Sequence, residues 1–180
     1  GQFNGWAVPF EQTWKADVLE FLRRDRNHPC VFLWSVGNEC VEHQINAKDQ
    51  GVAQLRELVD FVHVQEPSRR VTCALYPARA DGVVFWEDTK VKGEDKEPTP
   101  MTFYMDITSC NYMQTLFARD LARFPQLIFA ASEVSTNGGG RDWFDVDKKR
   151  GVGMFYWGGI DYIGESFSWP IKGWFHGFVD

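Results

Sequence analysis

The cysteines and histidines of this sequence form no pattern that is typical of a metal site. Its four cysteines contain no CxxC spacing, and its four histidines form neither HxH nor HExxH. We therefore expect no transition-metal centre built by the chain. Three of the cysteines lie in or beside predicted strands, where we expect an unpaired thiol to be buried like a small apolar side chain.

Excess positive charge, long apolar runs and phosphate-binding loops are lacking as well. The 19 lysines and arginines are outnumbered by 25 aspartates and glutamates, and the net charge of -6 argues against nucleic acid or an anionic membrane as a partner. The apolar stretch 151–163 is too short and too rich in glycine to span a bilayer. The glycines at 138–140 are not followed by the Lys-Ser/Thr pair of a nucleotide-binding loop. The first six residues show no signal-peptide pattern and no initiator Met, so periplasmic and cytoplasmic locations both fit the sequence.

The sequence does have a large apolar fraction, arranged in alternating strands and helices. Hydrophobic residues make up 44% of the 180 residues and aromatic residues 16%, enough for one domain with a sizeable core. Amphipathic spacing predicts helices at 14–24, 49–65, 114–123 and 142–149. Short apolar runs predict strands at 31–38, 71–75, 106–112, 127–133 and 152–157, with an irregular stretch at 78–100 that includes a charged loop at 90–98. This alternation indicates an α/β fold with a parallel sheet and right-handed crossovers.

Two of the predicted strands end in glutamate, at Glu39 and Glu133. The carboxyl ends of buried parallel strands open onto the active-site face of an α/β barrel. Two carboxylates on different strands are the catalytic pair of a glycosidase, and the amide of Asn38 is placed to bind a sugar hydroxyl. The alternative is that these polar residues only mark the points where strands meet water. Trp157 is interpreted either as an apolar platform for a sugar face or as a core residue, and Asp161 either as a ligand of sugar hydroxyls or as a support for its own loop.

The segment from Arg24 to Glu39, RDRNHPCVFLWSVGNE, resembles the acid/base signature of glycoside hydrolase family 2, whose usual form is close to RDRNHPSVxxWSxGNE. The main departure is Cys30, where serine is common. The segment 158–166, GGIDYIGES, with Trp-Pro at 169–170, looks like the last-strand segment of the β-galactosidase branch. The pair Ser132-Glu133 is similar to the nucleophile site of the same family. The resemblance covers nearly the whole chain.

This resemblance implies a (β/α)8 TIM barrel of which the chain supplies a part. In the family the acid/base glutamate ends strand four and the nucleophile ends strand seven. The five predicted strands would then be strands four to eight, and residues 1–180 the C-terminal portion of a catalytic barrel. A smaller open sheet is the alternative that the strand count leaves. Five strands cannot close in eight-strand geometry, so we expect exposed edges at 31–38 and 152–157, and either a partner that completes the barrel or self-association.

The resemblance also implies roles and an activity. Glu39 would be the general acid/base, Glu133 the nucleophile, and Tyr112 the residue that positions Glu133, unless it is only a tyrosine packed at the sheet edge with a solvated hydroxyl. The implied enzyme is a retaining exo-β-glycosidase, β-galactosidase-like as the first choice, with β-glucuronidase, β-mannosidase or a truncated barrel inactive on its own as alternatives. No cofactor is expected to be required. Some family members bind Mg²⁺ or Na⁺ near the acid/base glutamate, and the residues from Glu39 to Glu42 do not establish such a site here.

Overall fold

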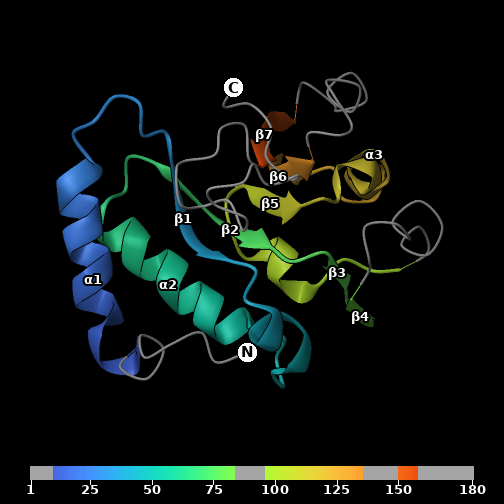
Figure 1. Ribbon diagram of the computed structural model, residues 1–180, viewed down its shortest axis with the longest axis horizontal. Helices are drawn as coiled ribbons and strands as arrows, with labels where there is room; N and C mark the ends of the chain where they lie inside the picture. The colour runs from blue at the N-terminus through green and yellow to red at the C-terminus, as the bar shows by residue number, and fades with distance from the viewer. Residues whose placement is uncertain (1–9, 84–95, 136–149, 158–180) are drawn as a thin grey trace, which may run out of the picture.

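In the computed structural model of the protein, the described residues are 10–83, 96–135 and 150–157. Within these ranges one sheet of five strands runs in the order β1-β2-β5-β6-β7, and every neighbouring pair is parallel. Its strands are β1 (Leu33–Asn38), β2 (Arg70–Leu75), β5 (Thr108–Asn111), β6 (Phe129–Ser135) and β7 (Gly151–Trp157). The predicted α/β fold with a parallel sheet is confirmed, with the strands lying in chain order (Figure 1).

The helices cover the sheet through apolar faces. Helix α1 (Phe10–Asp25) lies beside α2 (Val52–Gln65), and α2 packs on β1 and β2, whereas α3 (Phe117–Arg123) lies at the other end of the sheet (Figure 1). Leu55, Val59 and Val62 recur at helical spacing in α2 and are buried. The first turn of the predicted 114–123 helix is instead a 3₁₀ turn, η3 (Gln114–Leu116).

The sheet is strongly curled. Phe32 directly precedes β1, one edge of the sheet, and Phe155 lies in β7, the other edge, yet their rings stack with centroids 6.5 Å apart. Both side chains are still exposed, at 54% and 44%, as are Val152, Tyr156 and Trp157. The described residues therefore form part of a barrel wall with two open apolar edges, as the strand count predicts.

Several predicted boundaries are wrong for physical reasons that the structure shows. Strand β6 does not end at Glu133, because Val134 and Ser135 continue the ladder to Tyr156 and Trp157 of β7. The start of α2 is delayed because the Asp49 carboxylate accepts hydrogen bonds from the amides of residues 51 and 53. Inside the irregular stretch lies a small hairpin of β3 (Ala78–Arg79) and β4 (Gly82–Val83), followed by the 3₁₀ turn η2 (Pro100–Phe103).

The cysteines are all unpaired, but their burial differs from the expectation. Cys73 and Cys110 are buried, whereas Cys30 and Cys40 are exposed. The predicted helix at 142–149, the glycines at 138–140, most of the charged loop and Asp161 lie outside the described residues. None of the helices in the described ranges is long and apolar enough to cross a membrane.

Candidate active site

A β-bulge comes just before each of the two candidate carboxylates. Between β1 and β2 the register passes from Ser35 opposite Thr72 to Asn38 opposite Ala74, so β1 holds one extra residue. Between β5 and β6 it passes from Cys110 opposite Ala131 to Asn111 opposite Glu133, and the extra residue is Ser132. A bulge bends its strand and redirects the side chains that follow, and bulges are common beside active sites.

The backbone is left-handed at two residues of this region. Glu39, directly after β1, has φ 51°, and Tyr112, directly after β5, has φ 55°. Such a conformation is uncommon outside glycine and costs about 1–3 kcal/mol, so the surroundings must hold it. The amide of Glu39 donates to the carbonyl of Ala74 (2.9 Å), and the amide of Tyr112 donates to the carbonyl of Glu133 (2.7 Å). Both turns are thereby fixed to the neighbouring strand at the carboxyl-end edge of the sheet.

Asn111 connects three strands of the site and is fully buried. Its Nδ2 donates to Oε1 of Glu39 (2.9 Å) and to Oδ1 of Asn38 (3.1 Å). Its Oδ1 accepts a hydrogen bond of 2.7 Å from the hydroxyl of Ser132, the bulged residue of β6. Both amide protons and the amide oxygen are thus used, and the orientation of the Glu39 carboxylate is set by β5 and β6.

Tyr112 holds the second carboxylate. Its hydroxyl donates to Oε2 of Glu133 at 2.8 Å, so it is not the solvated tyrosine at a sheet edge that the sequence left as an alternative. Burial, and then the hydrogen bond to Glu133, raise the pKa of Tyr112 far above its ordinary value. The phenol therefore keeps its proton and remains a donor to Glu133 throughout the physiological range.

The segment that follows Glu39 is anchored to the end of β2. It forms a short π-helical turn, η1 (Glu42–Asn46), in which Gln44 is buried. The side-chain amide of Gln44 donates to the carbonyl of Tyr76 (3.0 Å), and its oxygen accepts from the amide of Tyr76 (2.9 Å). This two-point contact fixes the η1 turn to the residue that follows β2.

The structure brings most of the predicted site residues to one edge of the sheet. Glu39, Asn38, Tyr112 and Glu133 are linked directly or through Asn111. Trp157 is the last residue of β7 and is 66% exposed among the described residues. Asn111 and Ser132 were given no role of their own in the predicted site. Tyr112 and Glu133 were predicted as site residues because they stand at strand ends. Asn111 and Ser132 stand one residue earlier, so the same strand-end position could have indicated them.

In residues 10–83, 96–135 and 150–157, no group of three or more His, Cys, Asp or Glu is placed to hold a metal ion. Oδ1 of Asn38 and Oε1 of Glu39 both accept hydrogen bonds from the amide of Asn111.

Residues 9–125 match the family described as "Glycosyl hydrolases family 2, TIM barrel domain". The chain belongs to this family. The family match and its fold agree with the resemblance that the Arg24–Glu39 segment carries. A solved glycosyl hydrolase family 2 member from Bacteroides cellulosilyticus superposes with a TM-score of 0.69 and 29% identity, covering 87% of this chain and 19% of that protein.

The curated relatives carry activity names. The β-galactosidase BoGH2A of Bacteroides ovatus is 22% identical over 252 aligned positions, which cover 98% of this chain and 28% of that protein. A β-glucuronidase of Paenibacillus borealis is 37% identical over 62 residues, which cover 34% of this chain and 10% of that protein. The chain spans less than a third of the length of each relative. The relatives agree on glycoside hydrolysis and differ in the sugar that their names specify.

Proposed function

We propose that this chain carries the catalytic carboxylates of a retaining exo-β-glycosidase, with Glu133 as nucleophile and Glu39 as general acid/base. The observation that carries the proposal is the hydrogen-bonded cluster at the carboxyl-end edge, in which Asn111 holds Glu39 and Tyr112 holds Glu133. Each carboxylate is preceded by a bulge that aims it, and glycoside hydrolysis of this type needs two carboxyl groups on opposite sides of the scissile bond.

In the first step Glu133 attacks the anomeric carbon while Glu39 gives its proton to the leaving oxygen. Because Tyr112 binds Oε2 of Glu133, we assign Oε1 as the attacking atom. Because Asn111 binds Oε1 of Glu39, we assign Oε2 as the proton donor. The O–C glycosidic bond breaks and a glycosyl ester of Glu133 forms.

In the second step Glu39, now ionised, takes a proton from water, and the water oxygen displaces Glu133 from the anomeric carbon. The sugar is released with its original configuration. Oδ1 of Asn38 accepts from Asn111, so its Nδ2 donor is directed to a substrate hydroxyl. Trp157 provides an apolar surface for a sugar face, and Asp161 binds hydroxyls.

For the sugar, a β-galactoside is the first choice. The galactosidase alignment extends over 98% of the chain and so includes the 158–166 segment. A β-glucuronide is the second candidate, supported by the higher identity of the shorter glucuronidase alignment. A β-mannoside remains a third choice from the family resemblance alone. Whether the segment is active without the rest of a barrel is a separate question, because five strands leave the wall open.

The test uses the full-length protein that contains this chain and a panel of nitrophenyl β-glycosides. We expect the galactoside to have the highest kcat/KM, and dominant turnover of the glucuronide or mannoside would replace it. A 2-deoxy-2-fluoro sugar of the preferred type should then label Glu133 covalently, as peptide mass spectrometry would show. Labelling of any other carboxylate would overturn the assignment of the nucleophile, whatever the sugar.

A further inference from the structure

The hydrogen bond between Glu39 and Asn111 crosses the end of strand β2. Glu39 follows β1 and Asn111 ends β5, and these two strands are the neighbours of β2 in the sheet. Their 2.9 Å bond therefore passes over β2 near its carboxyl end. The amide of Glu39 also donates to the carbonyl of Ala74 in β2. The first residue after β2, Tyr76, thus comes next to this pair, on the way to the barrel mouth.

The alternation of side chains along β2 indicates which face Tyr76 occupies. Val71, Cys73 and Leu75 belong to the hydrophobic core, together with the buried residues of α2. Successive residues of an extended chain point to opposite faces. Ala74 and Tyr76 therefore lie on the other face, which is the inner face of the barrel wall.

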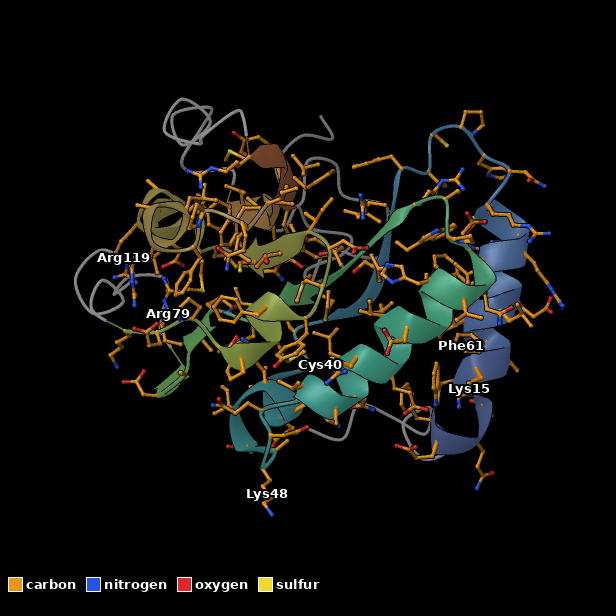
Figure 2. The ribbon with its side chains drawn as sticks, turned by 180° about the vertical axis from the view of Figure 1, so that it is seen from behind. Lys15, Cys40, Lys48, Phe61, Arg79 and Arg119 are labelled. Carbon is orange, nitrogen blue, oxygen red and sulfur yellow. The ribbon has the colours of Figure 1, made fainter. Side chains whose placement is uncertain are left out.

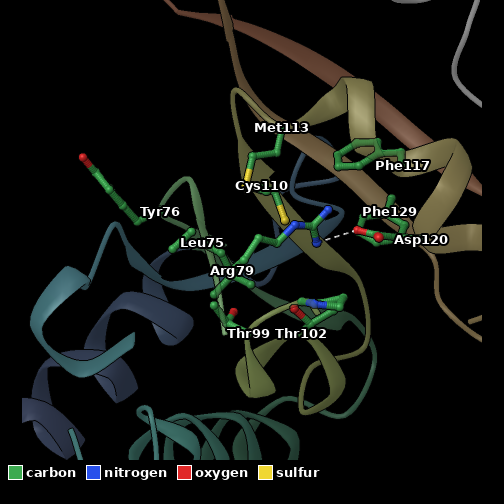
Figure 3. Close-up of a pocket in the computed structure, with 12 residues that line it drawn as sticks. Leu75, Tyr76, Arg79, Thr99, Thr102, Cys110, Met113, Phe117, Asp120 and Phe129 are labelled. Carbon is green, nitrogen blue, oxygen red and sulfur yellow. Dashed lines mark hydrogen bonds and ion pairs between the residues drawn. The ribbon is translucent and has the colours of Figure 1, made fainter. Parts of the chain in front are cut away.

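Figure 3 shows the same division where the strand ends. Leu75 and Cys110 are paired across β2 and β5, and both line a small cavity beside helix α3. Tyr76 also borders this cavity, but its ring is directed away from it. Tyr76 and Asn111 each follow one of the paired residues, so they stand side by side on the opposite face, where Asn111 contacts Glu39.

The main chain of Tyr76 is held by a buried glutamine. The side chain of Gln44 donates to the carbonyl of Tyr76 (3.0 Å) and accepts from its amide (2.9 Å), and it also reaches the hydroxyl of the buried Thr99 at 3.4 Å. Figure 2 shows the segment that carries Gln44 between Cys40, where the chain leaves β1, and Lys48, which projects away from the molecule. The half-buried ring of Tyr76 is thus carried by a fixed backbone, as a binding surface requires.

The chemistry of the reaction brings the leaving group to this place. Under the proposed function, on which this inference rests, Glu39 protonates the leaving oxygen. The group attached to that oxygen therefore lies beside Glu39, outside the pocket of the sugar that is cleaved. The ring of Tyr76 offers a flat apolar surface there, which suits an aryl ring or the apolar face of a second sugar.

We propose that Tyr76 forms the leaving-group subsite of this enzyme and stacks its ring on the flat face of the departing aryl group or sugar. The residue discriminates among leaving groups and takes no part in binding the sugar that is cleaved.

The first experiment compares leaving groups in the full-length protein, all attached to the sugar that it prefers. For a nitrophenyl glycoside and for a disaccharide, Tyr76→Ala should lower kcat/KM by about 5- to 50-fold, because a ring contact is lost in the transition state. For the glycosyl fluoride, whose leaving group is a single atom, kcat/KM should change by less than about twofold. A loss on only one of the two larger substrates would identify an aryl group or a sugar as the ligand.

Two further variants separate the ring from other effects. Tyr76→Phe keeps the ring and should behave like wild type. Tyr104→Ala removes an exposed ring that lies against Arg56 of α2, and as the matched control it should leave all three substrates unchanged. A loss on the glycosyl fluoride as large as on the other substrates would overturn the proposal, and so would unchanged kcat/KM on both larger substrates.

The second experiment begins with the wild-type enzyme. A 2-deoxy-2-fluoro sugar leaves a stable glycosyl ester on Glu133, and an acceptor that enters by the leaving-group subsite releases it. Reactivation by a phenyl β-glycoside should saturate with its concentration, whereas reactivation by methanol should rise linearly. Tyr76→Ala should raise the half-saturating concentration of the phenyl glycoside. A linear dependence for both acceptors in the wild type would overturn the proposal, whereas absence of the label on Glu133 would refute the proposed function itself.

Discussion

The side-chain amide of Asn111 donates a 2.9 Å hydrogen bond to the carboxylate of Glu39, although strand β2 lies between their two strands. The same amide accepts from Ser132, the residue next to Glu133. A single buried side chain therefore links the neighbourhoods of the two carboxylates. The arrangement makes Asn111 a positioning residue, because it contacts Glu39 rather than the sugar.

Asn111→Ala should lower kcat by about 10- to 150-fold, since a hydrogen bond to a charged group contributes about 1.5–3 kcal/mol. KM should change little, and alkyl glycosides should suffer more than nitrophenyl glycosides because they depend more on Glu39. Ser132→Ala should give a smaller loss of the same kind. Asn46→Ala removes an exposed asparagine that bonds Glu42 and serves as control. A loss confined to KM, or an equal loss on all leaving groups, would contradict the positioning role.

Glu39→Ala should be rescued by azide. Hydrolysis of an alkyl β-glycoside should fall by about 10²–10⁴-fold because its leaving oxygen needs the proton, whereas a nitrophenolate departs with little help. Azide attacks the glycosyl ester without a general base, and the product should be the β-glycosyl azide. Glu42→Ala, three residues along, should behave like wild type. An α-azide, seen by NMR of the product, would rule out double displacement with Glu39 as acid/base.

Tyr112→Phe should lower kcat by about 10- to 100-fold, because Glu133 loses the donor on its Oε2. The phenol's pKa is held well above its ordinary value by burial and then by Glu133. The wild-type donor therefore stays protonated as the pH rises, and the rate should show no alkaline limb from this group. Pre-steady-state kinetics should place the defect in formation of the glycosyl ester. Tyr104→Phe, at an exposed ring, is the control.

Stability should decline in the alkaline range. Burial raises the pKa of Cys73 and of Cys110 to about 12 from an ordinary 9.0. Above pH 9 the unfolded chain releases these protons while the folded chain keeps them. Their stabilisation is thus complete below pH 9 and lost as the pH rises toward 12, by about 1.4 kcal/mol per pH unit for each thiol.

Unfolding in urea at stepped pH would measure this decline. Replacing both buried cysteines by alanine should flatten the pH dependence while lowering stability at neutral pH. Cys30→Ala removes an exposed thiol and should leave the slope unchanged. An unchanged slope in the double variant would show that other groups cause the alkaline loss.

The isolated 180-residue chain should associate through its edges. The exposed side chains at β1 and β7 include Phe32, Phe155 and Trp157, and unpaired strand edges favour pairing with another chain. Light scattering should report dimers or larger species, and Phe32→Lys with Phe155→Lys should reduce them. Phe103→Lys, on an exposed ring of the turn η2, is the matched control. A monomer at all concentrations tested would refute the association. Turnover by the isolated chain near that of the full-length enzyme would show that the rest of the barrel wall is not needed for activity.

Much of the fold was predictable because it rests on local patterns. The apolar runs of β1, β2 and β6 and the helical spacing of Leu55, Val59 and Val62 identified the elements and their parallel order. The boundaries were less predictable. Whether β6 continued past Glu133 depended on Tyr156 and Trp157 across the next strand, and no property of the segment itself reports that pairing.

The sequence alone thus determined which residue types stand where parallel strands end, and so the two glutamates and the family signature around Glu39. Only the tertiary structure decided how they are aimed. The register of neighbouring strands and the curl of the sheet set three features of the site. These are the extra residue before each glutamate, the left-handed backbone at Glu39 and Tyr112, and the contacts of Asn111. The Arg79–Asp120 pair has the same origin, because it joins a hairpin to a helix far along the chain. Long-range side-chain contacts depend on distances that only packing sets, which is why no local pattern contains them.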